Sequence, residues 1–225
     1  MLKTHIYNQV STLSLFGRCE NYLYVSLAAT SLADHAPHPP QVGVLEAHNK
    51  DKPVIDPADF LSGVIRPTLA HLKKALPGMR HDIHVENLLL GTAVQESALR
   101  HLFQNDGNDD EYDNALGLYQ IESRTHHSIW DNYLSYREEL SGAVTELASR
   151  GFMDSEERFN NELVTNMAYA TAIARLVYLP VPERIPDTTA EQAEYWKKHY
   201  NTSSGAGKAM DYRANYQKHV IGALF

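Results

Sequence analysis

The sequence predicts a mainly α-helical domain over residues 55–225, and three observations support this. Apolar side chains recur at three- and four-residue spacing from residue 57 onward, which is the period of an amphipathic helix. Apolar residues make up 43% of the 225 residues, enough for one substantial core. The single cysteine, Cys19, cannot form an intramolecular disulfide, so the core must hold without covalent cross-links.

The first 50 residues have a different composition from the rest of the chain. Residues 4–30 are rich in Tyr, Val, Leu, Ser and Thr, which favours two short strands or a β-hairpin over a helix. A proline-rich linker follows, with prolines at positions 37, 39, 40 and 53. We therefore expect residues 1–50 to form a small extended or β-hairpin arm.

Charge and hydropathy argue against two classes of protein. The net charge is −8, whereas a nucleic-acid-binding protein needs clustered positive charge. The sequence has no run of 18 or more apolar residues, so we expect no membrane span. The apolar stretch at residues 22–33 follows Arg18 and Glu20 rather than a short basic segment, so we expect no export signal.

Helices are expected in the following order after residue 55. The first begins at Pro57, with Asp56 as its N-cap, and ends near Pro77. The second helix is expected at residues 82–103, and a polar loop at residues 105–114 follows it. Further helices are expected at residues 123–134, 137–150 and 156–179. Two more are expected in 189–225, on either side of a turn at 201–207.

Glu96 is the first residue that suggests chemistry. It lies late in the second expected helix, beside the apolar residues Ala93 and Leu99. Partial desolvation in such surroundings raises the pKa of a carboxyl group. A glycosidase needs a carboxylic acid that stays protonated near neutral pH, so that it can protonate the leaving oxygen. Most helix glutamates face solvent, so Glu96 becomes a candidate only through its context.

Three short motifs supply that context, in a fixed order along the chain. Glu96-Ser97 comes first, then Gly117–Glu122 (GLYQIE), then Tyr200-Asn201 with glycines at 205 and 207. This order resembles the lytic transglycosylase and goose-type lysozyme families. Their pattern is a Glu-Ser pair, a Gly-Leu-Met-Gln-(Ile/Val) turn and a Tyr-Asn-Ala-Gly segment. The resemblance covers residues 82–216 and implies a lysozyme-like, transglycosylase-type helical fold.

The resemblance also implies a role for each matched residue. Glu96 would be the catalytic acid/base, and Ser97 would help to position the sugar or the acid. Gly117 would let the backbone approach a ligand, while Tyr119 and Tyr200 would offer flat faces to sugar rings. The residues implied to line the saccharide groove are Gly117, Leu118, Tyr119, Gln120, Tyr200 and Asn201.

A second carboxylate would decide between hydrolysis and transglycosylation. Transglycosylases need none, because the substrate's N-acetyl group assists and a sugar hydroxyl attacks to leave a 1,6-anhydro end. Inverting hydrolases need a base roughly 6.5–9.5 Å from the acid to hold a water. Glu122 matches the position of a goose-type Asp and is the first candidate for that base. The acidic residues at 109–113 are further candidates, and the sequence leaves the choice open.

Metal and cofactor sites are not expected from the sequence. Asp106, Asn108 and Asp110 alternate as in a calcium loop, but Glu111 stands where such a loop has glycine. A solvated acidic loop is the simpler interpretation. The histidines at 81, 84, 126 and 127 lack the further ligands that a zinc site requires.

The setting that fits best is a tailed-bacteriophage particle. The stretches 115–134, 166–179 and 195–207 resemble phage virion proteins with a transglycosylase-like domain. The resemblance implies an enzyme in the virion that acts on peptidoglycan glycan strands and opens the bacterial wall locally for genome delivery. Residues 1–50 would dock on other virion proteins.

The alternatives are an inactive structural tail, baseplate or neck component with the same fold, and a free endolysin. Two departures from the family pattern favour the inactive component. Thr202-Ser203 replace the Ala-Gly that normally follows Tyr-Asn, and the linker from Glu96 to Gly117 is longer than in compact transglycosylases. Tyr119 also replaces the usual Met of the turn.

Overall fold

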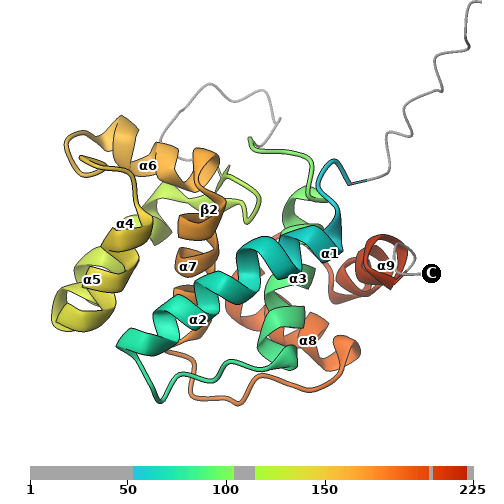
Figure 1. Ribbon diagram of the computed structural model, residues 1–225. Coiled ribbons are helices and arrows are strands. Elements are labelled where there is room, and N and C mark those ends of the chain that lie inside the picture. Colours follow the sequence, from blue (N-terminus) through green and yellow to red (C-terminus); the bar gives the residue numbers. More distant parts are fainter. Residues whose placement is uncertain (1–52, 104–114, 203–204, 222–225) are drawn as a thin grey trace, which may run out of the picture. The chain divides into compact units, whose positions relative to one another are not determined.

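The computed structural model describes residues 53–103, 115–202 and 205–221, and this part of the chain is mainly helical with one two-stranded sheet (Figure 1). The predicted mainly α class is therefore confirmed. The expected arm over residues 1–50 and the loop at 105–114, with its calcium-like pattern, lie outside the described residues. Among the described helices, none is long and apolar enough to cross a membrane.

The first helical run has the expected start and an irregular middle. The Asp56 carboxylate accepts hydrogen bonds from the backbone N–H groups of Ala58 and Asp59, so it caps α1 (Pro57–Phe60) as predicted. The chain then passes through a π-helical turn (Leu61–Ile65) into α2 (Arg66–Ala75). Pro67 has no N–H to continue the α-helical ladder, which accounts for a wider turn at this point.

Helix α3 (Ile83–Ser97) ends six residues before the expected end at Phe103. Ala98 and Leu99 both adopt left-handed backbone conformations, with φ of 53° and 52°. The Ser97 hydroxyl donates to the Ala93 carbonyl at 2.9 Å and accepts the Leu99 N–H at 3.2 Å, which stabilises this exit. The helix therefore stops one residue after Glu96, and that carboxyl lies at its end.

A short antiparallel hairpin follows the loop. Strand β1 (Ala115–Leu116) pairs with β2 (Ile121–Glu122), with Ala115 opposite Glu122 and Leu116 opposite Ile121. The four residues 117–120 form the connecting turn, as the motif predicts. The Gly117 N–H donates to the Leu102 carbonyl at 2.8 Å, which holds the turn against the segment that leaves α3.

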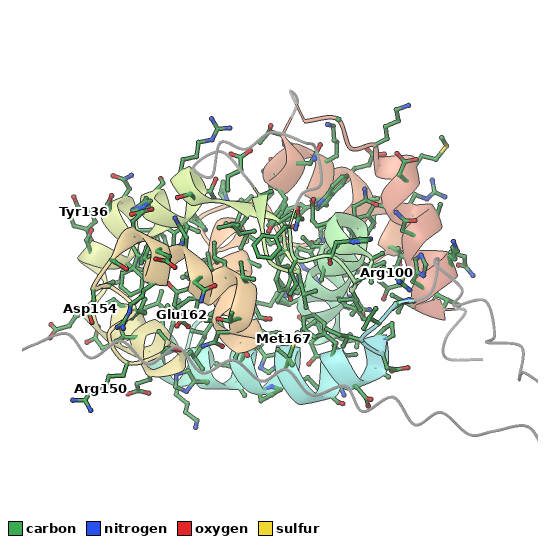
Figure 2. The ribbon with its side chains drawn as sticks, turned by 90° about the horizontal axis from the view of Figure 1, so that it is seen from above. Arg100, Tyr136, Arg150, Asp154, Glu162 and Met167 are labelled. Atoms are coloured by element: carbon green, nitrogen blue, oxygen red, sulfur yellow. The ribbon has the colours of Figure 1, made fainter. Side chains whose placement is uncertain are left out.

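Four helices follow the hairpin: α4 (Ser123–Asn132), α5 (Glu138–Leu147), α6 (Glu156–Thr165) and α7 (Met167–Tyr178), with a 3₁₀ turn at Leu134–Tyr136. The prediction of one continuous helix over 156–179 is wrong, because Asn166 interrupts it with φ −120° and ψ 93°. The Asn166 side chain accepts the Tyr169 N–H, which caps α7, and donates to the Leu147 carbonyl and the Glu162 carboxylate. Figure 2 labels this buried Glu162 on α6 and the exposed Tyr136 at the outer edge.

The C-terminal portion matches the expected pair of helices. Helix α8 (Thr189–Trp196) continues through a π-helical turn (Lys197–Asn201), and α9 (Ala209–His219) follows. Figure 1 shows α4, α5 and α6 towards one end of the described unit and α3, α8 and α9 towards the other. Helix α7 contacts helices of both groups, and α9 packs on α3 and α8. The end of α3 is thereby enclosed by elements from the last third of the chain.

Candidate active site

Glu96 lies in the last turn of α3, where an otherwise buried helix reaches a cavity. Its neighbours Ala93, Val94 and Ser97 are buried, while Glu96 itself is only partly exposed. The indole Nε1–H of Trp196, the last residue of α8, donates to Glu96 Oε1 at 2.8 Å. This bond spans 100 residues of sequence and fixes the direction of the carboxyl group.

The surroundings of Glu96 alter its acidity. Burial raises the pKa of this carboxyl from 4.5 to about 7, and the hydrogen bond from Trp196 opposes that rise. Near neutral pH the group is therefore poised between acid and carboxylate. It can give a proton to a leaving group and take one back within a single turnover.

Trp196 is a site residue that the sequence analysis does not predict. The Trp196 side chain is fully buried. Its ring lies 5.5 Å from that of Tyr212 in α9. At Gly207 a Cβ atom would lie 2.5 Å from the indole ring, so the glycine is needed for this close packing. The tryptophan itself could have indicated burial, even though two lysines follow it, because an indole ring seldom faces water.

Tyr200 and Asn201 are in the π-helical turn that follows α8. The Tyr200 hydroxyl donates to the Tyr119 carbonyl at 2.7 Å, which ties this turn to the hairpin. Burial raises the pKa of the Tyr200 hydroxyl well above its usual value, so it remains a donor. Asn201 Oδ1 accepts from Lys197 Nζ at 2.8 Å, and the same ammonium donates to the Gly205 carbonyl at 2.7 Å.

These elements surround one cavity of about 720 Å³. Its size is within the range of small-ligand sites. Of the residues predicted for the site, the structure brings Glu96, Glu122, Gln120, Tyr200 and Asn201 to its wall. The other lining residues are Gln95, Ala115, Arg124, Thr125, Trp196, Thr202, Gly205, Ala206 and Gly207.

The other predicted site residues lie behind this wall. Tyr119 is fully buried and its hydroxyl accepts a hydrogen bond from Thr171 at 3.3 Å, so the prediction that its ring offers a face to sugars is wrong. Leu118 is also a core residue. Ser97 is buried, and its hydroxyl is engaged with the backbone at the end of α3. Ser97 therefore positions the segment that carries Glu96.

Gly117 supports the site from behind the cavity wall. Its φ of +68° is in the left-handed region, and a Cβ atom there would lie 1.8 Å from the Leu163 carbonyl oxygen in α6. Gln120 is also left-handed, with φ +45°, and its side-chain amide donates to the Gly117 carbonyl at 2.8 Å. The hairpin turn is thus held by close backbone packing, and Gln120 closes it on the cavity side.

Glu122 and Arg124 are adjacent on the cavity wall. Arg124 Nε donates to Glu122 Oε2 at 2.5 Å, so this carboxylate is held by a guanidinium. Both side chains are well exposed. Arg124 and Thr125 were not predicted as site residues, although they lie within the Gly117–His126 stretch that carries the resemblance.

Replacement of Trp196 by phenylalanine is expected to move the pH dependence of any activity at Glu96. The indole bond stabilises the charged carboxylate, so its loss raises the pKa of Glu96 further. Cleavage that needs protonated Glu96 falls as pH rises through this pKa, so the alkaline limb should shift to higher pH in Trp196→Phe. The shift is measured as the initial rate against pH of sacculus solubilisation, the activity that the family resemblance implies.

The matched control is Trp130→Phe, because the Trp130 indole donates to Tyr169 at 2.9 Å and not to Glu96. This variant should keep the wild-type limb. Thermal unfolding of both variants verifies that each is folded at the assay temperature. An unchanged limb in Trp196→Phe would show that the indole does not set the acidity of Glu96.

No cluster of three or more His, Cys, Asp or Glu side chains suited to a metal ion occurs among the described residues. Comparisons of the chain with protein-family models, curated proteins and solved structures find no match.

Proposed function

We propose that this chain is a glycosidase of lysozyme-like fold that cleaves the β-1,4 bond between N-acetylmuramic acid and N-acetylglucosamine in peptidoglycan. The observation that carries the proposal is Glu96, a carboxyl with a pKa of about 7 at the wall of a 720 Å³ cavity. A group of this acidity in a cleft is what general acid catalysis at a glycosidic oxygen requires. Gln120, Tyr200 and Asn201 are on the same wall, as the family resemblance implies.

In the proposed reaction Glu96 acts first as an acid. Its proton goes to the glycosidic oxygen as the bond from that oxygen to C1 of the muramic acid breaks. The carbonyl oxygen of the substrate's own acetamido group forms a bond to C1 and carries the positive charge. Glu96, now a carboxylate, takes the proton of the C6 hydroxyl, and that oxygen displaces the acetamido oxygen at C1. The product ends in a 1,6-anhydro ring, and no water is consumed.

The position of Glu122 favours this transglycosylase route over hydrolysis. A hydrolase of the inverting type needs a free carboxylate that accepts a proton from water. Glu122 is on the cavity wall, but its Oε2 accepts a hydrogen bond from Arg124, and the pair is open to solvent. In the proposed mechanism Glu122 contributes to substrate binding and not to proton transfer.

Glu122→Gln is therefore expected to lower the rate of cleavage by no more than about fivefold, because an exposed ion pair is worth at most about 1 kcal/mol. The products should remain anhydro-ended. Rates and product masses from the same digest measure both quantities. A loss of 100-fold or more, which is about the contribution of a general base, would instead identify Glu122 as the base of a hydrolase.

The direct test is mass spectrometry of the fragments that wild-type protein and Glu96→Gln release from purified sacculi. Anhydro-muropeptides from the wild type alone would support a lytic transglycosylase with Glu96 as its acid/base. Reducing ends from the wild type would mean hydrolysis. No release by wild-type protein that is folded and binds sacculi would refute the enzyme and favour the structural tail, baseplate or neck component.

We also propose that the protein is carried in a phage particle and acts on the bacterial wall during genome delivery. The support is the resemblance of residues 115–134, 166–179 and 195–207 to transglycosylase-like virion proteins. Residues 1–50 would then dock on a neighbouring virion protein. Detection of the chain in purified particles, and its loss when residues 1–50 are deleted, would test this setting. Its absence from particles would favour a free endolysin.

A further inference from the structure

A buried arginine outside the Glu96 cavity has two nitrogen atoms without hydrogen-bond partners among the described residues. Arg175, in the last turn of α7, is only 3% exposed. Its Nε and Nη1 atoms are buried and have no hydrogen-bond partner within the described part of the chain. Burial lowers the pKa of this guanidinium to about 10. A buried charge without a partner is costly, and structures normally avoid it.

The acidic groups near Arg175 are already engaged by other cations. Asp82 accepts from Arg80, and Asp187 pairs with Arg80 at 3.3 Å and with Arg184 at 3.2 Å. Glu183 pairs with Lys198 at 2.5 Å and with His199 at 3.2 Å. None of these acids hydrogen-bonds Arg175, so the guanidinium is left as the local excess of positive charge.

Arg175 lines a cavity of about 470 Å³ that is separate from the Glu96 cavity. The two have no lining residue in common. Apart from Arg80, Glu183 and Arg184 at its rim, the wall is largely apolar or aromatic. Those wall residues are Leu76, Gly78, Met79, Tyr133, Tyr178, Leu179, Val181, Ile185 and Tyr195.

We propose that this cavity binds an organic monocarboxylate, with the carboxylate paired to Arg175 and an apolar body against the aliphatic and tyrosine walls. A guanidinium fits the planar carboxylate well and forms strong charge-assisted hydrogen bonds with it. Among the described cations that line this cavity, Arg80 and Arg184 are paired with acids, so Arg175 offers one positive charge, and the acidic Glu183 disfavours a second negative charge on the ligand. A cavity of this volume holds a body of about small-ligand size. The carboxylate belongs to a free small acid or to the C-terminus of a peptide that ends in an apolar residue.

Calorimetric titration of the full-length chain with hexanoate, and in parallel with the neutral hexanamide, tests the central claim. Hexanoate should bind at one site, and hexanamide about 10- to 100-fold more weakly, since a buried hydrogen-bonded charge contributes at about that level. A short peptide ending in leucine and its C-terminal amide distinguish the two sources. Binding of hexanoate alone assigns a small-acid site. Tighter binding of the free-acid peptide than of hexanoate assigns a peptide terminus.

Arg175→Met tests the role of the guanidinium and should weaken binding of whichever acid the wild type binds by the same 10- to 100-fold factor. Arg158→Met removes the same charge from an exposed position in α6, where Arg158 pairs with Asp154, and this variant should bind as the wild type does. Equal binding of hexanoate and hexanamide, unchanged binding in Arg175→Met, or no binding of any carboxylate would each overturn the proposal. Inorganic phosphate bound as tightly as hexanoate would overturn the requirement for an apolar body. The comparison of acid with amide needs no variant, so the proposal stays testable if Arg175→Met does not fold.

Discussion

Glu96→Gln should stabilise the folded chain at pH 8 by about 3 kcal/mol and lower the release of muropeptides about 1000-fold. The pKa of Glu96 rises from 4.5 in the unfolded chain to about 7 in the fold. Each unit of that difference corresponds to about 1.4 kcal/mol. The loss of activity follows because glutamine cannot give or take the proton at the glycosidic bond, and general acid/base catalysis contributes about 10²- to 10⁴-fold.

The sign of the stability effect depends on pH. Below pH 4.5 Glu96 is protonated in both the folded and the unfolded chain, and glutamine differs little from it. As pH rises from 4.5 to about 7, the unfolded chain loses this proton more readily, so the wild type becomes less stable. Above pH 7 the full penalty is present in the wild type and absent from Glu96→Gln.

Urea unfolding at pH 4 and pH 8 gives the free energy of unfolding of the wild type and of Glu96→Gln. The stability gap between the two proteins should be small at pH 4 and about 3 kcal/mol at pH 8. Other titrating groups act on both proteins alike and cancel in the comparison. The control is Glu139→Gln, which removes the same charge from an exposed position in α5 and should show no comparable gain at pH 8. Equal gaps at the two pH values for Glu96→Gln would contradict the raised pKa.

Gly117→Ala is expected to destabilise the fold by at least about 4 kcal/mol, which is in the range of the most severe single substitutions. The added Cβ would lie 1.8 Å from the Leu163 carbonyl oxygen and 2.8 Å from its carbon, and both are backbone atoms that cannot rotate away. The φ of +68° adds a further cost for any L side chain. The hairpin must therefore separate from α6.

Gly142→Ala provides the control for this substitution. Gly142 is in the middle of α5, and its Cβ would meet open space. Alanine there should stabilise the helix by about 0.5–1 kcal/mol. Denaturant midpoints of the two variants give the comparison. A Gly117→Ala protein as stable as the wild type would show that the turn does not require this close approach.

The sequence could predict those features that depend on local pattern. The helix that begins at Pro57 and the turn between β1 and β2 follow from capping and glycine chemistry, which act within a few residues. Glu96, Gln120, Tyr200 and Asn201 reach one cavity as their order along the chain suggests. Local chemistry fixes where an element starts, and motif order indicates which elements meet.

The features that the sequence could not predict depend on contacts between distant segments. Asn166 separates α6 from α7 because its side chain bonds to the end of α5, which helix periodicity does not report. Tyr119 is turned into the core, where Thr171 of α7 meets its hydroxyl. Trp196 bonds Glu96 only because α8 packs against the end of α3. In each case the partner is 19 to 100 residues away.

The long sequence separation of Glu96 and Trp196 has a consequence for biosynthesis. A ribosome that has released α3 but not yet α8 has made the acid without its indole partner and without the helices that exclude water from it. Glu96 then titrates like any glutamate in a peptide, and it is almost fully ionised at neutral pH. The raised pKa that keeps Glu96 protonated near neutral pH arises only once α8 and α9 have packed onto α3. In the proposed mechanism, the nascent chain therefore acquires its acid only after α9 has been synthesised.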